Sequence, residues 1–193
     1  MNKKQIVTIP NLLSLLRILL VPLFLWVYLR AETLQEHLAA AGILALSGLT
    51  DLLDGLIARH YNMITDLGKL LDPAADKLTQ ASVIVALTLR YPPVIILLVV
   101  FAIKEIAMIA GGLFLLKKKT TVVSSKWFGK VSTAVFYLTM FALIAVPNVP
   151  PQAVNMTVLV NVCFLTFSFI KYIPVFFQLK DPKKNGDSLS SEK

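Results

Sequence analysis

The sequence predicts an all-α integral membrane protein: a bundle of six transmembrane helices preceded by a short N-terminal interfacial segment. Hydrophobic residues make up 56% of the 193 residues and charged residues only 16%, and the mean hydropathy is +0.74. Several apolar runs approach the roughly 20 residues that a helix needs to cross a bilayer. We expect one membrane domain over residues 1–180 and a polar cytoplasmic tail over residues 181–193.

Polar or proline-containing stretches separate the apolar runs. Residues 1–10 hold Lys3 and Lys4 among apolar residues, which predicts a segment lying on the membrane surface until Pro10 turns the chain. The first apolar run is too long for a cleavable signal peptide, and no small-x-small site follows it. Prolines at 92–93 and 147–151 predict later turns. The predicted spans are residues 12–29, 38–58, 67–89, 94–116, 128–146 and 154–177.

The net charge of +8 is explained by a membrane rather than by a polyanionic partner. When six spans alternate across the bilayer, both termini and the connections near 59–66 and 117–127 lie on one side. Only Arg30 and Arg90 then lie clearly on the other side. The positive-inside rule makes the first side cytoplasmic. Because no aromatic-basic recognition module is present, we expect no nucleic-acid partner.

Five of the 11 acidic residues lie within the 26 residues 51–76, and four of them form two close pairs: Asp51 with Asp54 and Asp72 with Asp76. Their spacings of three and four residues put each pair on one face of a helix. Carboxylates at membrane depth are costly and usually mark a functional site. Four converging carboxylates offer hard oxygen ligands, which suit Mg²⁺, Mn²⁺ or Ca²⁺. The pattern therefore predicts a divalent-metal site, with room for a two-ion clamp on a phosphoryl group.

The residues between the two pairs predict a ligand site and a helix start. Gly55 and Ala58 share a helix face with the first pair, so a ligand could approach the backbone closely there. Arg59 adds a fixed cation for a phosphate group. Asp66 lies between the two helices and could cap the second of them.

The complete stretch resembles the signature of the CDP-alcohol phosphotransferases, which include phosphatidyltransferases. All eight fixed positions are filled, in the order Asp51-x-x-Asp54-Gly55-x-x-Ala58-Arg59, eight residues, Gly68-x-x-x-Asp72-x-x-x-Asp76. The resemblance implies a membrane enzyme that moves a phosphatidyl or similar group from a CDP-linked donor to an alcohol and releases CMP. It also implies metal binding by the first three aspartates and general-base catalysis by Asp76, which we expect also to approach the metal.

The resemblance extends to the donor site and to assembly. It implies two divalent ions, Mg²⁺ or Mn²⁺, and a homodimer among membrane lipids. The residues expected to bind the donor nucleotide are Asp54, Gly55, Ala58, Arg59 and Gly68.

Further motifs resemble those of the bacterial phosphatidylglycerophosphate synthases. They are Asn11-Leu12-x-Ser14-x-x-Arg17, Asp72-Pro73-x-Ala75-Asp76-Lys77 and Trp127-x-Gly129-Lys130-x-x-Thr133. This resemblance implies CDP-diacylglycerol as donor, glycerol 3-phosphate as acceptor and a bacterial inner membrane as location. The sequence departs from that pattern at Lys104-Glu105, where Arg-Glu is expected. Candidate residues for the acceptor phosphate are Arg17, Glu105, Lys126, Lys130 and Lys171.

Other functions stay open at this point. The same chemistry could use phosphatidylglycerol, giving cardiolipin, or an inositol phosphate or serine. A metal-coupled transporter would also place aspartates in membrane helices, although it would favour broken helices and repeat symmetry. A noncatalytic lipid-binding membrane protein is a third possibility. Glu105 is predicted to face the bundle, and it is not expected to form a self-contained pair with the adjacent Lys104.

Overall fold

Six long helices and one short 3₁₀ turn make up the fold. The computed structural model describes residues 8–61, 65–117 and 127–180, and the regular secondary structure within them is all helical. The elements are α1 (Ile9–Arg30), α2 (Leu34–His60), α3 (Asp66–Arg90), η2 (Pro92–Val94), α4 (Ile95–Lys117), α5 (Trp127–Ala145) and α6 (Pro151–Lys180). Each predicted span falls on one of these helices, so the all-α membrane bundle is confirmed. The expected interfacial segment and polar tail lie mostly outside the described residues.

Threonine side chains cap the starts of α1 and α2. Thr8 precedes α1, so Pro10 lies inside the first turn rather than before the helix as predicted. Proline is tolerated there because the first helical N–H groups have no partner within the helix. At α2, Glu36 N–H donates to Thr33 Oγ1 (3.3 Å) and Thr33 N–H donates to Glu36 Oε2 (2.9 Å). This reciprocal pair of bonds is a capping box.

The start of α3 differs from the sequence prediction. Thr65 Oγ1 accepts a hydrogen bond from Gly68 N–H (2.9 Å), so Thr65 is the N-cap, and the prediction of Asp66 as cap was wrong. Asp66 is already the first helical residue, which shifts the helix start by one position. Pro73 lies inside the helix, beyond its first turn. It removes one backbone hydrogen bond there, and the helix nevertheless continues to Arg90.

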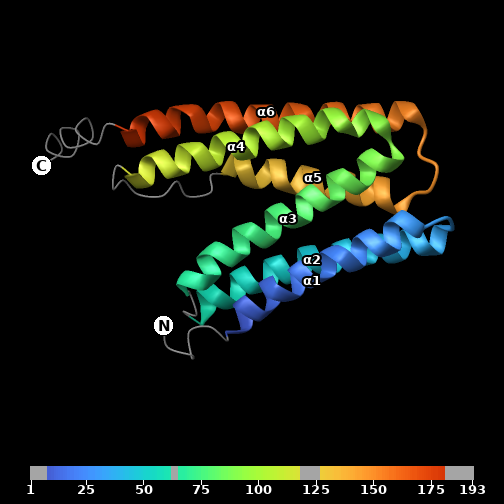
Figure 1. Ribbon diagram of the computed structural model, residues 1–193, viewed down its shortest axis with the longest axis horizontal. Helices are drawn as coiled ribbons and strands as arrows, with labels where there is room; N and C mark the ends of the chain where they lie inside the picture. The colour runs from blue at the N-terminus through green and yellow to red at the C-terminus, as the bar shows by residue number, and fades with distance from the viewer. Residues whose placement is uncertain (1–7, 62–64, 118–126, 181–193) are drawn as a thin grey trace, which may run out of the picture.

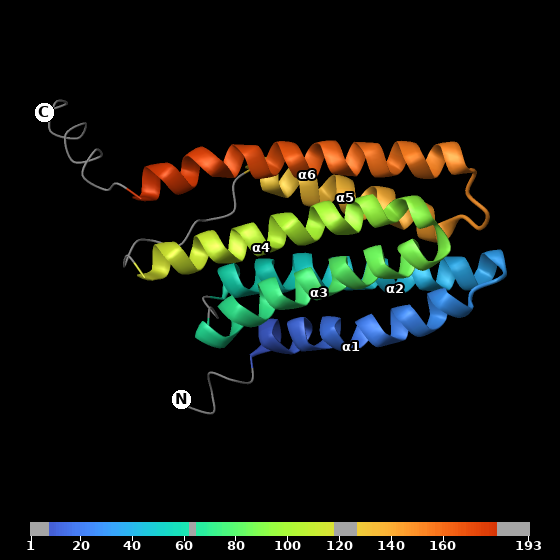
Figure 2. The same cartoon turned by 45° about the horizontal axis from the view of Figure 1, so that its top comes forward.

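The bundle has two groups of three helices, shown in Figures 1 and 2. Helix α1 packs against α2 and α3, and α6 packs against α4 and α5. Contacts of α2 with α5 and of α3 with α4 join the two groups. Successive helices run in opposite directions, so the starts of α1 and α3 and the ends of α2, α4 and α6 point to the same end, on the left of Figure 1. We call this the site end.

Among the helices that the structure describes, five are long and apolar enough to span a membrane, and α3 is the exception. The five spans are 9–30, 34–58, 92–113, 127–145 and 151–174. Only 22–33% of the residues in their apolar windows are buried inside the protein, so most of their side chains are left to face lipid. Helix α3 carries Asp72, Asp76 and Lys77 in its first half. Its 25 residues nevertheless give a length of about 37 Å, and it packs along α1 as the sixth helix of the bundle.

The core is apolar and contains a few polar groups with defined partners. Its largest members are Phe24, Tyr28, Ile84, Leu87, Leu97, Phe136, Met140 and Ile144. His37 falls between the predicted spans 12–29 and 38–58, where a loop was expected, and this was wrong: it is fully buried in the first turn of α2, with Nδ1 2.7 Å from the carbonyl oxygen of Ile144. Cys163 is exposed on α6. Buried polar groups therefore connect helices as well as forming the site.

We predict that Asn161→Leu destabilises the contact between α5 and α6. Asn161 is buried, and its Nδ2 donates to Thr139 Oγ1 across the two helices at 2.8 Å. Interhelical hydrogen bonds in membrane bundles contribute about 0.6 kcal/mol on average and about 1.7 kcal/mol at most. Unfolding of the purified protein in mixed micelles should show a loss in this range. The exposed Asn155 on the same helix offers the control: Asn155→Leu should leave stability unchanged, and an equal loss in both variants would contradict the prediction.

Candidate active site

The acidic cluster forms where α2 ends and α3 begins. Asp54 lies six residues before the end of α2, and Asp72 lies six residues after the start of α3. At 1.5 Å per residue, both are about 9 Å from the helix ends, so the two helices present them at a common depth. Ligand atoms of Asp51, Asp54 and Asp72 all lie within 4.8 Å of one another. We call these three residues the acidic cluster.

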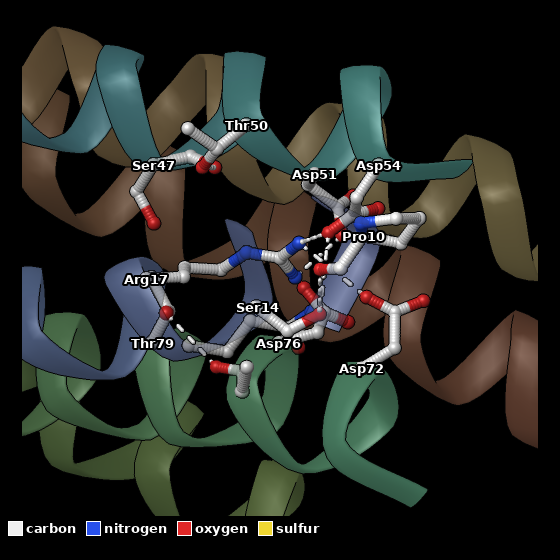
Figure 3. Close-up of polar contacts among 12 residues, drawn as sticks. Pro10, Ser14, Arg17, Ser47, Thr50, Asp51, Asp54, Asp72, Asp76 and Thr79 are labelled. Atoms are coloured by element: carbon white, nitrogen blue, oxygen red, sulfur yellow. Dashed lines mark hydrogen bonds and ion pairs between the residues drawn. The ribbon is translucent and has the colours of Figure 1, made fainter. Parts of the chain in front are cut away.

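Arg17 of α1 reaches into the acidic cluster from inside the bundle (Figure 3). Its Nη1 lies 2.5 Å from Asp51 Oδ1, and its Nη2 lies 2.5 Å from Asp54 Oδ2 and 3.4 Å from Asp72 Oδ1. The Arg17 side chain is fully buried, whereas the side chains of Asp51 and Asp72 are 37% and 45% exposed. Ser14 Oγ also donates to Asp54 Oδ2, at 3.4 Å. The carboxylates are therefore held from the buried side and open on the other side.

The first turn of α3 packs closely on α1 at Gly68. A Cβ atom at this position would lie 2.7 Å from Asn11 Oδ1 and 3.0 Å from Thr65 Oγ1. Thr65 Oγ1 also donates to Asn11 Oδ1, at 3.1 Å. A larger residue here would push against the side chains of Asn11 and Thr65, which is a packing reason for glycine in addition to its predicted role at the donor. Gly55 and Ala58 are half-buried on α2 after the acidic cluster, and the side chain of Arg59 lies outside the described residues.

Asp76 is held separately from the acidic cluster. Its Oδ1 accepts a hydrogen bond from Tyr137 Oη at 2.8 Å, and its Oδ2 accepts one from Gln80 Nε2 at 2.9 Å. Tyr137 comes from α5, so the bond crosses between the two helix groups. The Asp76 carboxylate is thus fixed at both oxygens, and each oxygen keeps a further lone pair. Its predicted roles as general base and metal ligand stay predictions.

A cavity of about 160 Å³ opens beside Asp76, between α3, α4, α5 and α6. Besides Asp76, its lining includes the charged residues Lys77, Lys104 and Glu105 and the polar residues Gln80, Ser132, Thr133, Ser168 and Tyr172. Tyr172 lies against Gly129, where a Cβ atom would come within 2.8 Å of its Oη. The mixture of cations, hydroxyl groups and a carboxylate suits a small polar ligand more than an acyl chain.

Glu105 links two lysines at the wall of this cavity. Lys77 of α3 forms an ion pair with Glu105 Oε2, and Lys104 Nζ donates to Glu105 Oε1 at 2.8 Å. The sequence argument against a self-contained pair of Lys104 and Glu105 holds, because Lys77 shares the carboxylate. The two residues do touch, because a lysine side chain is long enough to fold back along its own helix. The three residues therefore form one charged group, which we call the Lys–Glu–Lys group.

The other basic residues expected at the acceptor lie elsewhere. Lys130 on α5 and Lys171 on α6 are exposed and are not among the residues lining the cavity. Lys171 Nζ lies over the Phe167 ring, 5.8 Å from its centre. Arg17 contacts the acidic cluster, and Lys126 lies outside the described residues. Roles of these residues at the acceptor stay predictions.

Sequence reasoning had assigned no role to several residues of the site. Lys77 ends the motif Asp72-Pro73-x-Ala75-Asp76-Lys77, but the sequence indicated no function for it. Gln80 could have been found, because it lies one helical turn after Asp76. Tyr137 gave no signal, since an isolated tyrosine in an apolar span is usually a core residue.

The acidic cluster fits a divalent metal ion by its donor chemistry. Carboxylate oxygens are the ligands that Mg²⁺ and Mn²⁺ prefer. Oxygens on opposite sides of a Mg²⁺ ion are separated by about 4 Å, which is compatible with ligand atoms that all lie within 4.8 Å of one another. The exposed sides of Asp51 and Asp72 leave access for water or phosphate oxygens.

Comparison with known proteins agrees with the geometry. The profile of the CDP-alcohol phosphatidyltransferase family matches residues 7–170. The CDP-diacylglycerol–glycerol-3-phosphate 3-phosphatidyltransferase of Aquifex aeolicus is 35% identical over 139 residues, which are 70% of this chain and 74% of that protein. The Escherichia coli protein of the same name is 32% identical over 170 residues, covering 86% of this chain and 92% of that protein.

A relative named for a different activity is also similar. The cardiolipin synthase (CMP-forming) of Streptomyces coelicolor is 46% identical over 112 residues, which are 56% of this chain. The matched region spans about half of that protein, 52% of its length. The names of these relatives therefore describe two different activities. The chain belongs to the CDP-alcohol phosphatidyltransferase family, a family of membrane transferases.

Proposed function

We propose that this protein transfers a phosphatidyl group from CDP-diacylglycerol to sn-glycerol 3-phosphate, giving phosphatidylglycerophosphate and CMP. The observation that carries the choice of acceptor is the cavity beside Asp76 with its two lysines. A phosphate group needs cations, and the reacting hydroxyl needs a nearby proton acceptor. Relatives named for this acceptor match 74–92% of their own length, which supports the same choice.

The donor would bind at the acidic cluster. In this proposal Asp51, Asp54 and Asp72 hold the divalent ions, and Asp76 approaches them from the cavity. Bound Mg²⁺ or Mn²⁺ ions, two in the complete site, would neutralise the diphosphate and the charge on the departing CMP. Gly55 and Ala58 would leave room for the nucleotide, with Gly68 and Arg59 completing the donor site.

The acceptor would bind in the cavity with its hydroxyl near Asp76. The Asp76 carboxylate takes the hydroxyl proton while the acceptor oxygen bonds to the phosphorus that carries diacylglycerol. The bond between that phosphorus and the oxygen of CMP breaks, and CMP leaves. Hydrogen bonds from Gln80 and Tyr137 keep the carboxylate in a fixed orientation. Lys77 and Lys104, which line the same cavity, would pair with the acceptor phosphate.

Phosphatidylglycerol is the second candidate acceptor, which would make the product cardiolipin. The 46% identity to a cardiolipin synthase favours it, although that match covers 56% of this chain. The cavity is more consistent with the smaller acceptor, since phosphatidylglycerol carries two acyl chains and a single phosphate charge. Family membership supports an enzyme over the transporter and the noncatalytic lipid-binding protein.

We propose that the site end faces the bacterial cytoplasm. Lys117 ends α4 on this side and is followed in the sequence by two more lysines, and the positive-inside rule then gives the orientation. The donor lipid would enter from the inner leaflet, and the water-soluble acceptor would enter from the cytosol. The active form would be a homodimer.

The proposed reaction predicts acceptor-dependent release of CMP. Purified protein with CDP-diacylglycerol and Mg²⁺ would be given glycerol 3-phosphate, phosphatidylglycerol, an inositol phosphate or serine in parallel. We expect CMP and phosphatidylglycerophosphate with glycerol 3-phosphate, and no product when Mg²⁺ is removed by EDTA. Cardiolipin formed from phosphatidylglycerol alone would instead select the second candidate.

Asp76→Asn should separate catalysis from donor binding. Loss of a general base lowers turnover by about 100-fold or more, so CMP release should fall by at least that factor. Metal-dependent binding of CDP-diacylglycerol should remain, because the acidic cluster is intact. Asp51→Asn is the matched variant, and it should weaken donor binding itself. Wild-type turnover in Asp76→Asn would remove Asp76 as the base.

Lys104→Gln tests the acceptor site. A hydrogen bond to a charged group contributes about 1.5–3 kcal/mol, so its loss should raise KM for glycerol 3-phosphate by about tenfold or more. The KM for CDP-diacylglycerol should stay unchanged. Lys104→Arg keeps the charge and should retain most of the affinity. Equal changes in both KM values would show that Lys104 acts on the fold rather than on the acceptor.

A further inference from the structure

Arg17 is the one cation among the described residues that contacts all three members of the acidic cluster. It is the ninth residue of α1 and is fully buried, and its guanidinium group lies on the inner side of the carboxylates. Asp54, its innermost partner, has a side chain only 3% exposed. A metal ion entering from the open side would meet carboxylate oxygens that are already paired with the positive guanidinium group of Arg17.

The charges of this group can be counted. Three carboxylates and one guanidinium leave two negative charges, which one divalent ion balances. Arginine does not lose its proton in proteins, so this charge is always present. The count covers only the three carboxylates that contact Arg17; the carboxylate of Asp76, which accepts hydrogen bonds from Gln80 and Tyr137, is not included. Without Arg17, three close carboxylates would repel one another at membrane depth.

We propose that Arg17 is a built-in counter-cation: it holds the acidic cluster together without metal and weakens metal binding until the donor arrives. The inference rests on the proposed function, in which the same carboxylates bind metal. The donor's diphosphate brings negative charge of its own to the open side and offsets the repulsion between Arg17 and the ions. Metal and donor therefore strengthen each other's binding, and this coupling is reciprocal. Arg17 is a positioning residue and not a candidate base.

The test is a titration of the purified full-length protein with Mn²⁺, followed by electron paramagnetic resonance, without and with CDP as the soluble part of the donor. For the wild type we expect CDP to strengthen Mn²⁺ binding by on the order of tenfold. Arg17→Gln removes the charge and keeps a polar side chain. It should bind Mn²⁺ more tightly than the wild type when CDP is absent, and CDP should then add little.

Thermal unfolding gives a second measurement on the same variants. In EDTA, Arg17→Gln should unfold at a lower temperature than the wild type, because the carboxylates lose their counter-charge. Mn²⁺ should supply a counter-charge to the variant and so remove this difference in unfolding temperature. Ser14→Ala is the matched control, since Ser14 also contacts Asp54 but carries no charge. It should leave the Mn²⁺ affinity unchanged.

Three results would overturn the proposal: weaker Mn²⁺ binding by Arg17→Gln without CDP, an unchanged unfolding temperature in EDTA, or an equal affinity change in Ser14→Ala. Arg17→Lys, which keeps the charge but loses the two-pronged contact, is the second variant if Arg17→Gln does not fold. Its Mn²⁺ affinity without CDP should rise by less than tenfold, and a fall would count against the proposal. Mn²⁺ binding that persists unchanged in Asp51→Asn would instead mean that the metal site of the proposed function is wrong.

Discussion

The buried ion pairs between Arg17 and the acidic cluster are the interaction on which the site depends. They join α1, α2 and α3 at a single point and make α1 part of the site although it carries none of the four aspartates. Losing one partner of such a buried group costs about 3–5 kcal/mol. Apolar residues could join the three helices equally well. The ion pairs are therefore best explained by the need to keep carboxylates available for metal binding.

The two helix groups contribute different parts of the site. The group α1–α3 holds the acidic cluster, and the cavity with its lysines lies where α3 meets α4, α5 and α6. Asp76 lies at the boundary, where the hydrogen bond from Tyr137 ties it to the second group. In the proposed reaction the phosphorus and the acceptor hydroxyl would meet at this boundary. Their alignment would then depend on how the two groups pack.

Much of the fold and the centre of the site could be predicted from the sequence. Apolar runs of bilayer length gave the helices, and the spacing of the four aspartates gave two helix ends that face each other. The helix starts were less predictable, because Thr65 and Asp66 are both good caps and only the hydrogen bond to Gly68 decides between them. His37 was misplaced in a loop because its partner, the carbonyl of Ile144, is 107 residues away.

The residues that line the cavity could not be predicted in detail, because they too come from distant parts of the sequence and meet only when the helices pack. Tyr137 reaches Asp76 across the interface between the helix groups, and the sequence pattern of α5 does not indicate which face packs on α3. The contact of Lys104 with Glu105 depends on the conformation of one flexible side chain. Periodicity predicts helices and faces, whereas these contacts depend on how the faces meet.

The polar first half of α3 has a consequence for biogenesis. This helix is the one that lacks a bilayer-length apolar window, so it would partition poorly from a translocon into lipid by itself. Helices α1 and α2 precede it in synthesis, and α1 carries Asn11 and Arg17, which contact Thr65 and Asp72 at the start and in the first half of α3. Insertion of α3 would then be cooperative with the hairpin before it, and the residues that assemble the site would also bring that helix into the membrane.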